Sequence, residues 1–178
     1  TQNLLADADV LYTGVGKVNA SYVLTKSILQ NRPDFIINIG TAGSKNFNYG
    51  EIVCCEKFIQ RDMNATVFGY KNFVTPSDST PQILEIPSSL SQFFQNRGIC
   101  GTGDSFETKI TGNELYNVVD MEAFALAKIA FVEKIPFICV KFVSDGANDN
   151  APSIWSESLQ IGAKKMRESY NLIVENLQ

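Results

Sequence analysis

Carboxylates end two strand-like apolar runs of this chain, at places where they could do chemistry. In "VVDMEAFALAK" an apolar pair runs into Asp120, Met121 and Glu122, and a helical pattern follows. In "FICVKFVSD" the apolar run ends on Ser144 and Asp145. A carboxylate can hold sugar hydroxyls, and a carboxyl group in a semi-apolar pocket has a raised pKa and can act as a general acid.

Each of these features also has a purely structural explanation. Asp120 and Glu122 could favour the positive N-terminus of the following helix, and Asp145 could belong to an Asp-Gly turn. Met121 adds weight to a binding site, because methionine is a soft apolar residue that can lie against a ribose or a ring. Phe106, which follows Gly-Asp-Ser, is either a core residue or a platform for a planar base.

The composition excludes several kinds of site. The 178 residues contain no histidine, which excludes histidine triads and histidine metal sites. Proton transfer near neutral pH must fall to a carboxylate, lysine, tyrosine or cysteine. The net charge of −4 and the lack of a basic cluster argue against nucleic acid as a partner. No apolar run reaches the roughly 18 residues of a membrane span, so we expect no membrane partner.

Four cysteines lie in apolar, strand-like runs, and none forms a C-x-x-C pair. They are Cys54, Cys55, Cys100 and Cys139. We expect reduced, buried thiols, which favours the cytoplasm as the compartment.

Alternating strand and helix patterns predict an α/β fold with a central mixed, mostly parallel sheet flanked by helices. Strands are expected at 8–12, 35–40, 51–59, 65–68, 98–104, 117–120 and 136–143, helices at 18–30, 89–97, 121–134 and 156–177, and an excursion loop at 71–88. Gly14-Val15-Gly16-Lys17 fits no nucleotide-binding pattern and predicts a tight turn between a strand and a helix. In such folds, sites lie beyond the carboxyl ends of the strands.

Five short motifs occur in an order that resembles a known family. "TGVGKVNAS", "INIGTAGS", "GDSF", "VDMEA" and "VSDGAND" resemble the purine nucleoside phosphorylase superfamily, and most of all its 5′-methylthioadenosine/S-adenosylhomocysteine nucleosidases. "RDMNATVFGY" is similar to the segment between the second and third motifs. The resemblance implies a single nucleoside phosphorylase-like domain over 1–178 that lacks the family's first strand. It implies no cofactor and no metal.

The resemblance assigns the catalytic roles to two of the motifs. Glu122 would bind the ribose hydroxyls, and Met121 would line the ribose. Asp145 would protonate N7 of the leaving purine, with Ser144 as its hydrogen-bonding partner.

The remaining substrate contacts come from four other places. By resemblance, Phe106 would stack on the base, Thr41 would lie near the nucleophile, and Trp155 would help to form the pocket for the 5′ substituent. Lys141 stands where the family has arginine, and the two are not equivalent at a fork-type contact. Glu107 stands where an apolar residue is common, and could accept from the N1–H of a 6-oxopurine.

The activity implied is hydrolysis of the N-glycosidic bond of 5′-methylthioadenosine and S-adenosylhomocysteine, with release of adenine. Asn38 stands where phosphorylases of the superfamily carry a phosphate-binding arginine, which favours water as the nucleophile. One alternative is a nucleosidase or phosphorylase for an inosine-like or guanosine-like nucleoside. Another is a catalytically impaired nucleoside-binding protein, because the family's water-activating glutamate has no counterpart after Thr1. The resemblance also implies a homodimer.

Overall fold

Six strands in the described part of the chain pair into one sheet that closes on itself. The computed structural model describes residues 8–107, 114–146 and 151–177, and only the backbone within 151–160. The strands are β1 (Ile36–Gly43), β2 (Ile52–Gln60), β3 (Leu84–Glu85), β4 (Asn96–Thr102), β5 (Val118–Asp120) and β6 (Phe137–Asp145). Their order is β3-β2-β4-β5-β1-β6, and β2 also pairs with β6. The strands from β2 to β6 therefore form a closed ring.

The sheet is mixed, and its long ladders are parallel. β1 pairs in parallel with β6 along its whole length, and β2 does so with β4. The shorter ladders of β2 with β3, β2 with β6 and β1 with β5 are antiparallel. The expectation of a central mixed, mostly parallel sheet is confirmed. The strand patterns had no polar face because both faces of this sheet are covered.

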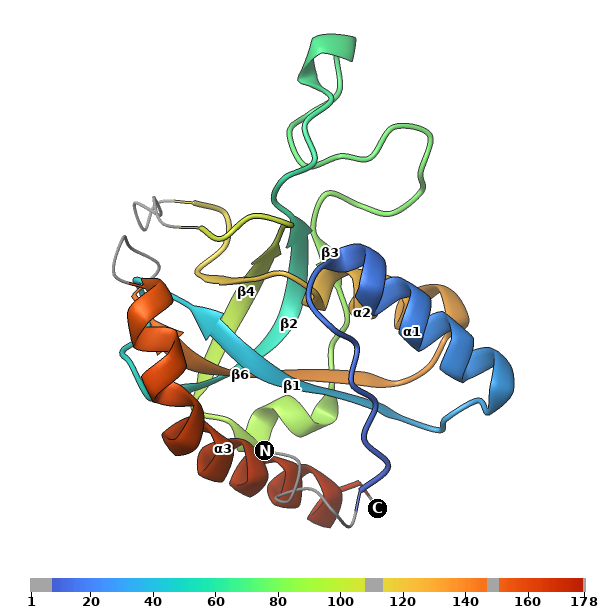
Figure 1. Cartoon of the computed structure of the whole chain (residues 1–178). Coiled ribbons are helices and arrows are strands. Elements are labelled where there is room, and N and C mark those ends of the chain that lie inside the picture. Colours follow the sequence, from blue (N-terminus) through green and yellow to red (C-terminus); the bar gives the residue numbers. More distant parts are fainter. Residues whose placement is uncertain (1–7, 108–113, 147–150, 178) are drawn as a thin grey trace.

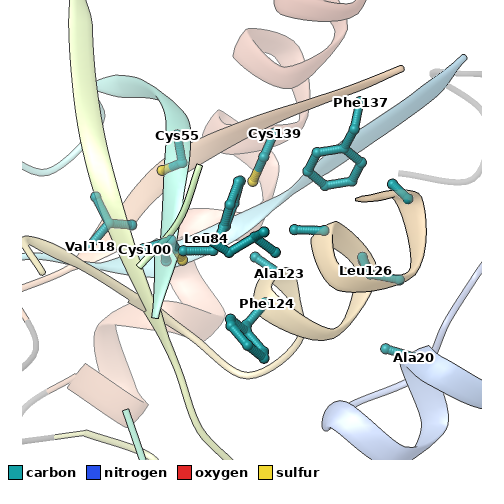
Figure 2. Packing of buried hydrophobic residues seen from close by; sticks show 14 of the residues in the cluster. Ala20, Cys55, Leu84, Cys100, Val118, Ala123, Phe124, Leu126, Phe137 and Cys139 are labelled. Carbon is teal, nitrogen blue, oxygen red and sulfur yellow. The ribbon is translucent and has the colours of Figure 1, made fainter. Parts of the chain in front are cut away.

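Helices cover the two faces of the sheet. α1 (Lys17–Gln30) and α2 (Ala123–Glu133) run side by side on one face, and α3 (Ala151–Glu175) crosses the other (Figure 1). Alternate residues along each strand face opposite layers, so Cys55 and Cys139 pack with α2, whereas Cys54 and Val140 pack with Ile173 of α3. Figure 2 shows Cys55 and Cys139 among the apolar side chains of the first layer. All four cysteines are buried and free of disulfides, as expected.

Two expected strands are wrong. Residues 8–12 have no ladder partner among the described residues, and Leu11 and Tyr12 are exposed. Apolar composition alone does not make a strand without a partner. Residues 65–68 contain the 3-10 helix η1 (Thr66–Phe68), because the Asn64 side chain accepts from Thr66 N–H (3.1 Å) and stabilises a turn.

The other expected elements agree with the structure apart from their ends, except that the loop expected at 71–88 contains β3. The segment around η1 projects away from the sheet as a long excursion (Figure 1). "SLSQFFQNR" divides into the 3-10 helix η2 (Ser89–Phe93) and the start of β4. α2 begins two residues later than expected, and β6 continues to Asp145. Among the described residues, no helix has the length and apolar character that crossing a membrane requires.

Candidate active site

One glycine of β1 brings the two candidate catalytic strands together. Gly43 is the register partner of Val119 on β5 and of Asp145 on β6. Neighbouring strands lie about 5 Å apart, so the ends of β5 and β6 are separated by roughly 10 Å. Glu122 is the second residue after β5, and Asp145 is the last residue of β6. Both carboxylates therefore belong to chain segments that meet at Gly43.

Asp145 is enclosed and has a partner in Ser144. Its residue is only 4% exposed, and Ser144 is fully buried. The Ser144 hydroxyl donates to Asp145 Oδ2 over 2.8 Å, as the sequence suggested. The main chain of Asp145 is also held in place, because Ser44 N–H donates to the Asp145 carbonyl (3.1 Å). A bulge in the β1–β6 ladder lies between Ala42 and Gly43, opposite these residues, and bulges often redirect side chains at active sites.

Glu122 occupies the N-cap position of α2, yet its side chain does not cap that helix. Oε1 instead accepts from the main-chain N–H of Gly16, 2.8 Å away. Partial burial raises the pKa of Glu122, and the Gly16 N–H opposes this shift. The side chain is half-buried, with Met121 half-buried beside it. The capping explanation for Glu122 is therefore not the one that the geometry supports.

Asp120 takes the structural role instead. Oδ2 accepts from Ala123 N–H at the start of α2 (2.8 Å), and Oδ1 accepts from the Thr102 hydroxyl (2.6 Å). Lys141 Nζ lies 2.8 Å from Oδ2, with both side chains almost fully buried. Burial favours the neutral acid, but Lys141 and the hydrogen bonds outweigh it and lower the pKa of Asp120.

The same ion pair defines the surroundings of Lys141. Burial alone would lower the pKa of Lys141, but the Asp120 carboxylate raises it well above its usual value. The cation therefore joins β6 to β5. Its ammonium is paired with Asp120, so the structure gives Lys141 a supporting role beside the candidate site.

An arginine that the sequence analysis did not single out holds the loop of Phe106. Arg61, the first residue after β2, donates to Gly103 O (3.3 Å), to the Ser105 hydroxyl (3.1 Å) and to the Ser105 carbonyl. It also pairs with Glu107 (3.3 Å). A Cβ at Gly103 would lie 2.9 Å from the guanidinium carbon, so glycine is needed for this approach. The sequence feature that could have pointed to Arg61 is its position just after a predicted strand.

The other candidate residues are placed as follows. Phe106 is 50% exposed on the loop after β4, as a stacking platform would be. Thr41 lies within β1, two residues before Gly43, and is half-buried. Trp155 lies in the first turns of α3, where the structure does not describe side chains.

A groove in the described part of the chain lies elsewhere. It has a volume of about 970 Å³ and runs between α1 and α2, lined by residues such as Val18, Tyr22, Leu29 and Val132. Glu122, Asp145 and Phe106 do not line it. This groove is therefore not the candidate active site.

Comparison with known proteins identifies the family of this chain. The family model described as the phosphorylase superfamily matches residues 8–177. A 5′-methylthioadenosine/S-adenosylhomocysteine nucleosidase of Buchnera aphidicola is 32% identical over 94% of this chain and 79% of its own length. The chain belongs to this nucleosidase family of the phosphorylase superfamily. A Staphylococcus epidermidis member is also 32% identical, over 93% of this chain and 80% of its own length.

Solved structures of the nucleosidase family have the same fold. The Neisseria meningitidis enzyme, in complex with methylthio-immucillin-A, is 26% identical, with a TM-score of 0.81 over 91% of this chain and 78% of that chain. A Helicobacter pylori variant with 5′-methylthioadenosine in its active site has a TM-score of 0.84, and the match covers 92% of this chain and 78% of that chain. Its sequence is 20% identical, so this likeness bears on the fold alone.

Proposed function

We propose that this chain hydrolyses the N-glycosidic bond of 5′-methylthioadenosine and S-adenosylhomocysteine and releases adenine. The observation that carries the proposal is the pairing of Gly43 with both Val119 and Asp145. It supports a site in which the Glu122 and Asp145 carboxylates flank one nucleoside from opposite ends of its scissile bond. The names of the relatives support the choice of substrate.

The two carboxylates have complementary tasks in this reaction. Cleavage builds positive charge on the ribose, so Glu122 near the 2′- and 3′-hydroxyls binds more strongly in the transition state than in the ground state. Asp145 donates a proton to N7, so the base leaves as a neutral molecule. A positioned general acid contributes roughly 10²–10⁴-fold to the rate. The same pairing of roles operates in O-glycosidases, which also pass through an oxocarbenium-like state.

The surroundings of Asn38 support water rather than phosphate as the nucleophile. Asn38 stands where phosphorylases of the superfamily carry an arginine. The Asn38 side-chain oxygen accepts from the Cys139 thiol (3.2 Å), so Asn38 has a partner within the sheet. Phosphate recognition would need a fixed cation such as arginine at this place.

The contacts of Glu107 favour an adenine base over a 6-oxopurine. One Glu107 oxygen pairs with Arg61, which holds the carboxylate in the loop beside Phe106. That oxygen is engaged within the protein, which weakens the case for recognition of an N1–H. The runner-up remains a nucleosidase for an inosine-like or guanosine-like nucleoside.

We further propose a homodimer that works in the cytoplasm. The groove between α1 and α2 carries strongly exposed apolar side chains, with Val18 78% and Leu29 82% exposed. A second copy that covers these residues would remove a large apolar surface from water. The reduced state of the four buried cysteines agrees with a reducing compartment.

Adenine release tests the proposed function. Purified protein is incubated with 5′-methylthioadenosine, S-adenosylhomocysteine or inosine, with and without phosphate, and the free base is measured. We expect adenine from the first two substrates at a rate independent of phosphate. Release that requires phosphate would make the chain a phosphorylase, and nucleoside binding without turnover would make it a binding protein.

A further inference from the structure

The turn before α1 reaches the proposed ribose site through its backbone. Gly16 N–H donates to Glu122 Oε1 over 2.8 Å, although the two residues lie 106 positions apart. Gly16 has a φ of 91°, and a Cβ there would lie 3.2 Å from Asp104 Oδ1. Residues that carry a Cβ rarely adopt this backbone conformation. Glycine therefore allows the N–H at this position to face the carboxylate.

An ion cluster fixes this turn to two strand exits. Lys17 Nζ lies 2.5 Å from Asp62 Oδ2 and 2.9 Å from Asp104 Oδ2. Lys17 N–H donates to Asp104 Oδ1 (2.8 Å), and Asp104 N–H donates to Asp62 Oδ2 (2.9 Å). Asp62 follows β2, and Asp104 follows β4. The first residue of α1 is therefore tied to both exits, next to the residue that contacts Glu122.

The protonation states agree with a cluster that is charged at neutral pH. Partial burial would lower the pKa of Lys17, but the two carboxylates outweigh it and raise that pKa. The Lys17 N–H and the Lys17 ammonium lower the pKa of Asp104. The cluster lies near the surface, so its contribution to stability is small, and its effect is mainly on geometry.

We infer that Gly16 and Lys17 are positioning residues for catalysis: the Gly16 N–H orients the Glu122 carboxylate toward the ribose, and the Lys17–Asp62–Asp104 cluster holds Gly16 in place. This inference rests on the proposed function, because it assigns Glu122 to the ribose. One carboxylate oxygen accepts from the Gly16 backbone, and a carboxylate has about four acceptor positions, so it can also accept from sugar hydroxyls. Orientation of this kind is worth most when the partner gains charge during the reaction.

The cluster could also act on Glu122 simply through the charge of Lys17. Two variants that change the charge in opposite directions distinguish this charge effect from the positioning role. Lys17→Met removes a positive charge, whereas Asp62→Leu removes a negative charge together with the oxygen that accepts from Lys17 and Asp104. Both variants therefore break the cluster. Loss of the Gly16 hydrogen bond raises the pKa of Glu122 in both variants. A charge effect alone raises that pKa in Lys17→Met and lowers it in Asp62→Leu.

The experiment is a titration of the Glu122 carboxyl carbon by NMR in the wild type and in both variants. Lys164→Met, which changes an exposed lysine of α3, is the matched control and should titrate like the wild type. Asp120 and Lys141 also act on Glu122, and they are unchanged in all four proteins. An upward shift in both cluster variants is the expected result. A downward shift of the Glu122 pKa in Asp62→Leu, or no shift in either cluster variant, would overturn the inference.

Kinetics provide the second readout. We expect kcat/KM for 5′-methylthioadenosine to fall about tenfold in both cluster variants, the effect of one misplaced hydrogen bond. Unchanged kcat/KM in both variants would also overturn the positioning role. If the wild type itself releases no adenine, the proposed function fails, while the titration still decides whether the turn controls Glu122.

Discussion

At the scale of single residues, Asp145 is the group whose removal should separate chemistry from folding. Asp145→Asn keeps the size of the side chain and can still accept from Ser144, so we expect the fold to be unchanged. Turnover should fall by about 10²–10⁴-fold, because an amide cannot donate an acidic proton to N7. Adenine release and circular dichroism measure the two effects.

The matched control for this change is Asp34→Asn, which makes the same substitution at an exposed position. It should retain wild-type turnover. An Asp145→Asn protein with wild-type kcat would remove Asp145 from the role of general acid.

Glu122 should show a conflict between stability and activity. Its pKa is raised by partial burial, so the ionised carboxylate destabilises the folded state at any pH above that raised value. Glu122→Gln removes the charge and should raise Tm at pH 7–8 by about 2–4 °C. Turnover should nevertheless be lost, because the neutral amide stabilises a cationic ribose poorly.

The pH dependence supplies the check on this prediction. The wild type gains stability relative to Glu122→Gln as the pH falls through the raised pKa, so the difference in Tm should narrow on acidification. Over the same range, wild-type kcat/KM should fall, since the carboxylate becomes protonated. A Tm difference that does not vary with pH would refute this account of Glu122.

At the scale of elements, the buried pair of Asp120 and Lys141 joins β5, β6 and the start of α2. Asp120→Asn leaves the Lys141 charge buried without a compensating partner, so we expect it to lower the free energy of unfolding by about 3–5 kcal/mol. The double variant Asp120→Leu/Lys141→Met should lose less free energy of unfolding than Asp120→Asn, because no unpaired buried charge remains. Denaturant unfolding measures both.

An exposed pair on the same sheet provides the comparison. Lys57 and Glu85 pair across β2 and β3 with both side chains largely in water. Glu85→Gln should cost at most about 1 kcal/mol. Equal losses for Asp120→Asn and Glu85→Gln would show that burial does not govern the contribution of the inner pair.

What the sequence could predict at this scale follows from how local each signal is. The strands at 36–43 and 137–145 were recognisable because each contains a nearly continuous apolar run. The strand expected at 8–12 failed, since pairing depends on a partner far away in the chain. For the same reason no pattern placed Gly16 against Glu122 or Arg61 against the loop of Phe106, although each lies at a strand exit or a turn.

At the scale of the whole molecule, the apolar groove between α1 and α2 is where we expect a second copy to bind. Light scattering of the wild type should give the mass of a dimer. Val18→Glu/Leu29→Glu places two charges on this face and should yield a monomer, because charged groups at the centre of an interface are costly to desolvate. Val174→Glu, an exposed change on α3, should remain dimeric. A dimeric Val18→Glu/Leu29→Glu protein would move the interface elsewhere.

The closure of the sheet by β2 and β6 has a consequence for how the chain matures. That ladder joins residues 52–55 to 139–142, so a ribosome must release most of the polypeptide before the ring can shut. Such distant pairings slow folding, because closing the long intervening loop costs entropy before the stabilising contacts form. Cys54, Cys55 and Cys139 all lie in this ladder. We expect these thiols to be accessible to oxidants during synthesis, until β6 has been made and the ladder has formed.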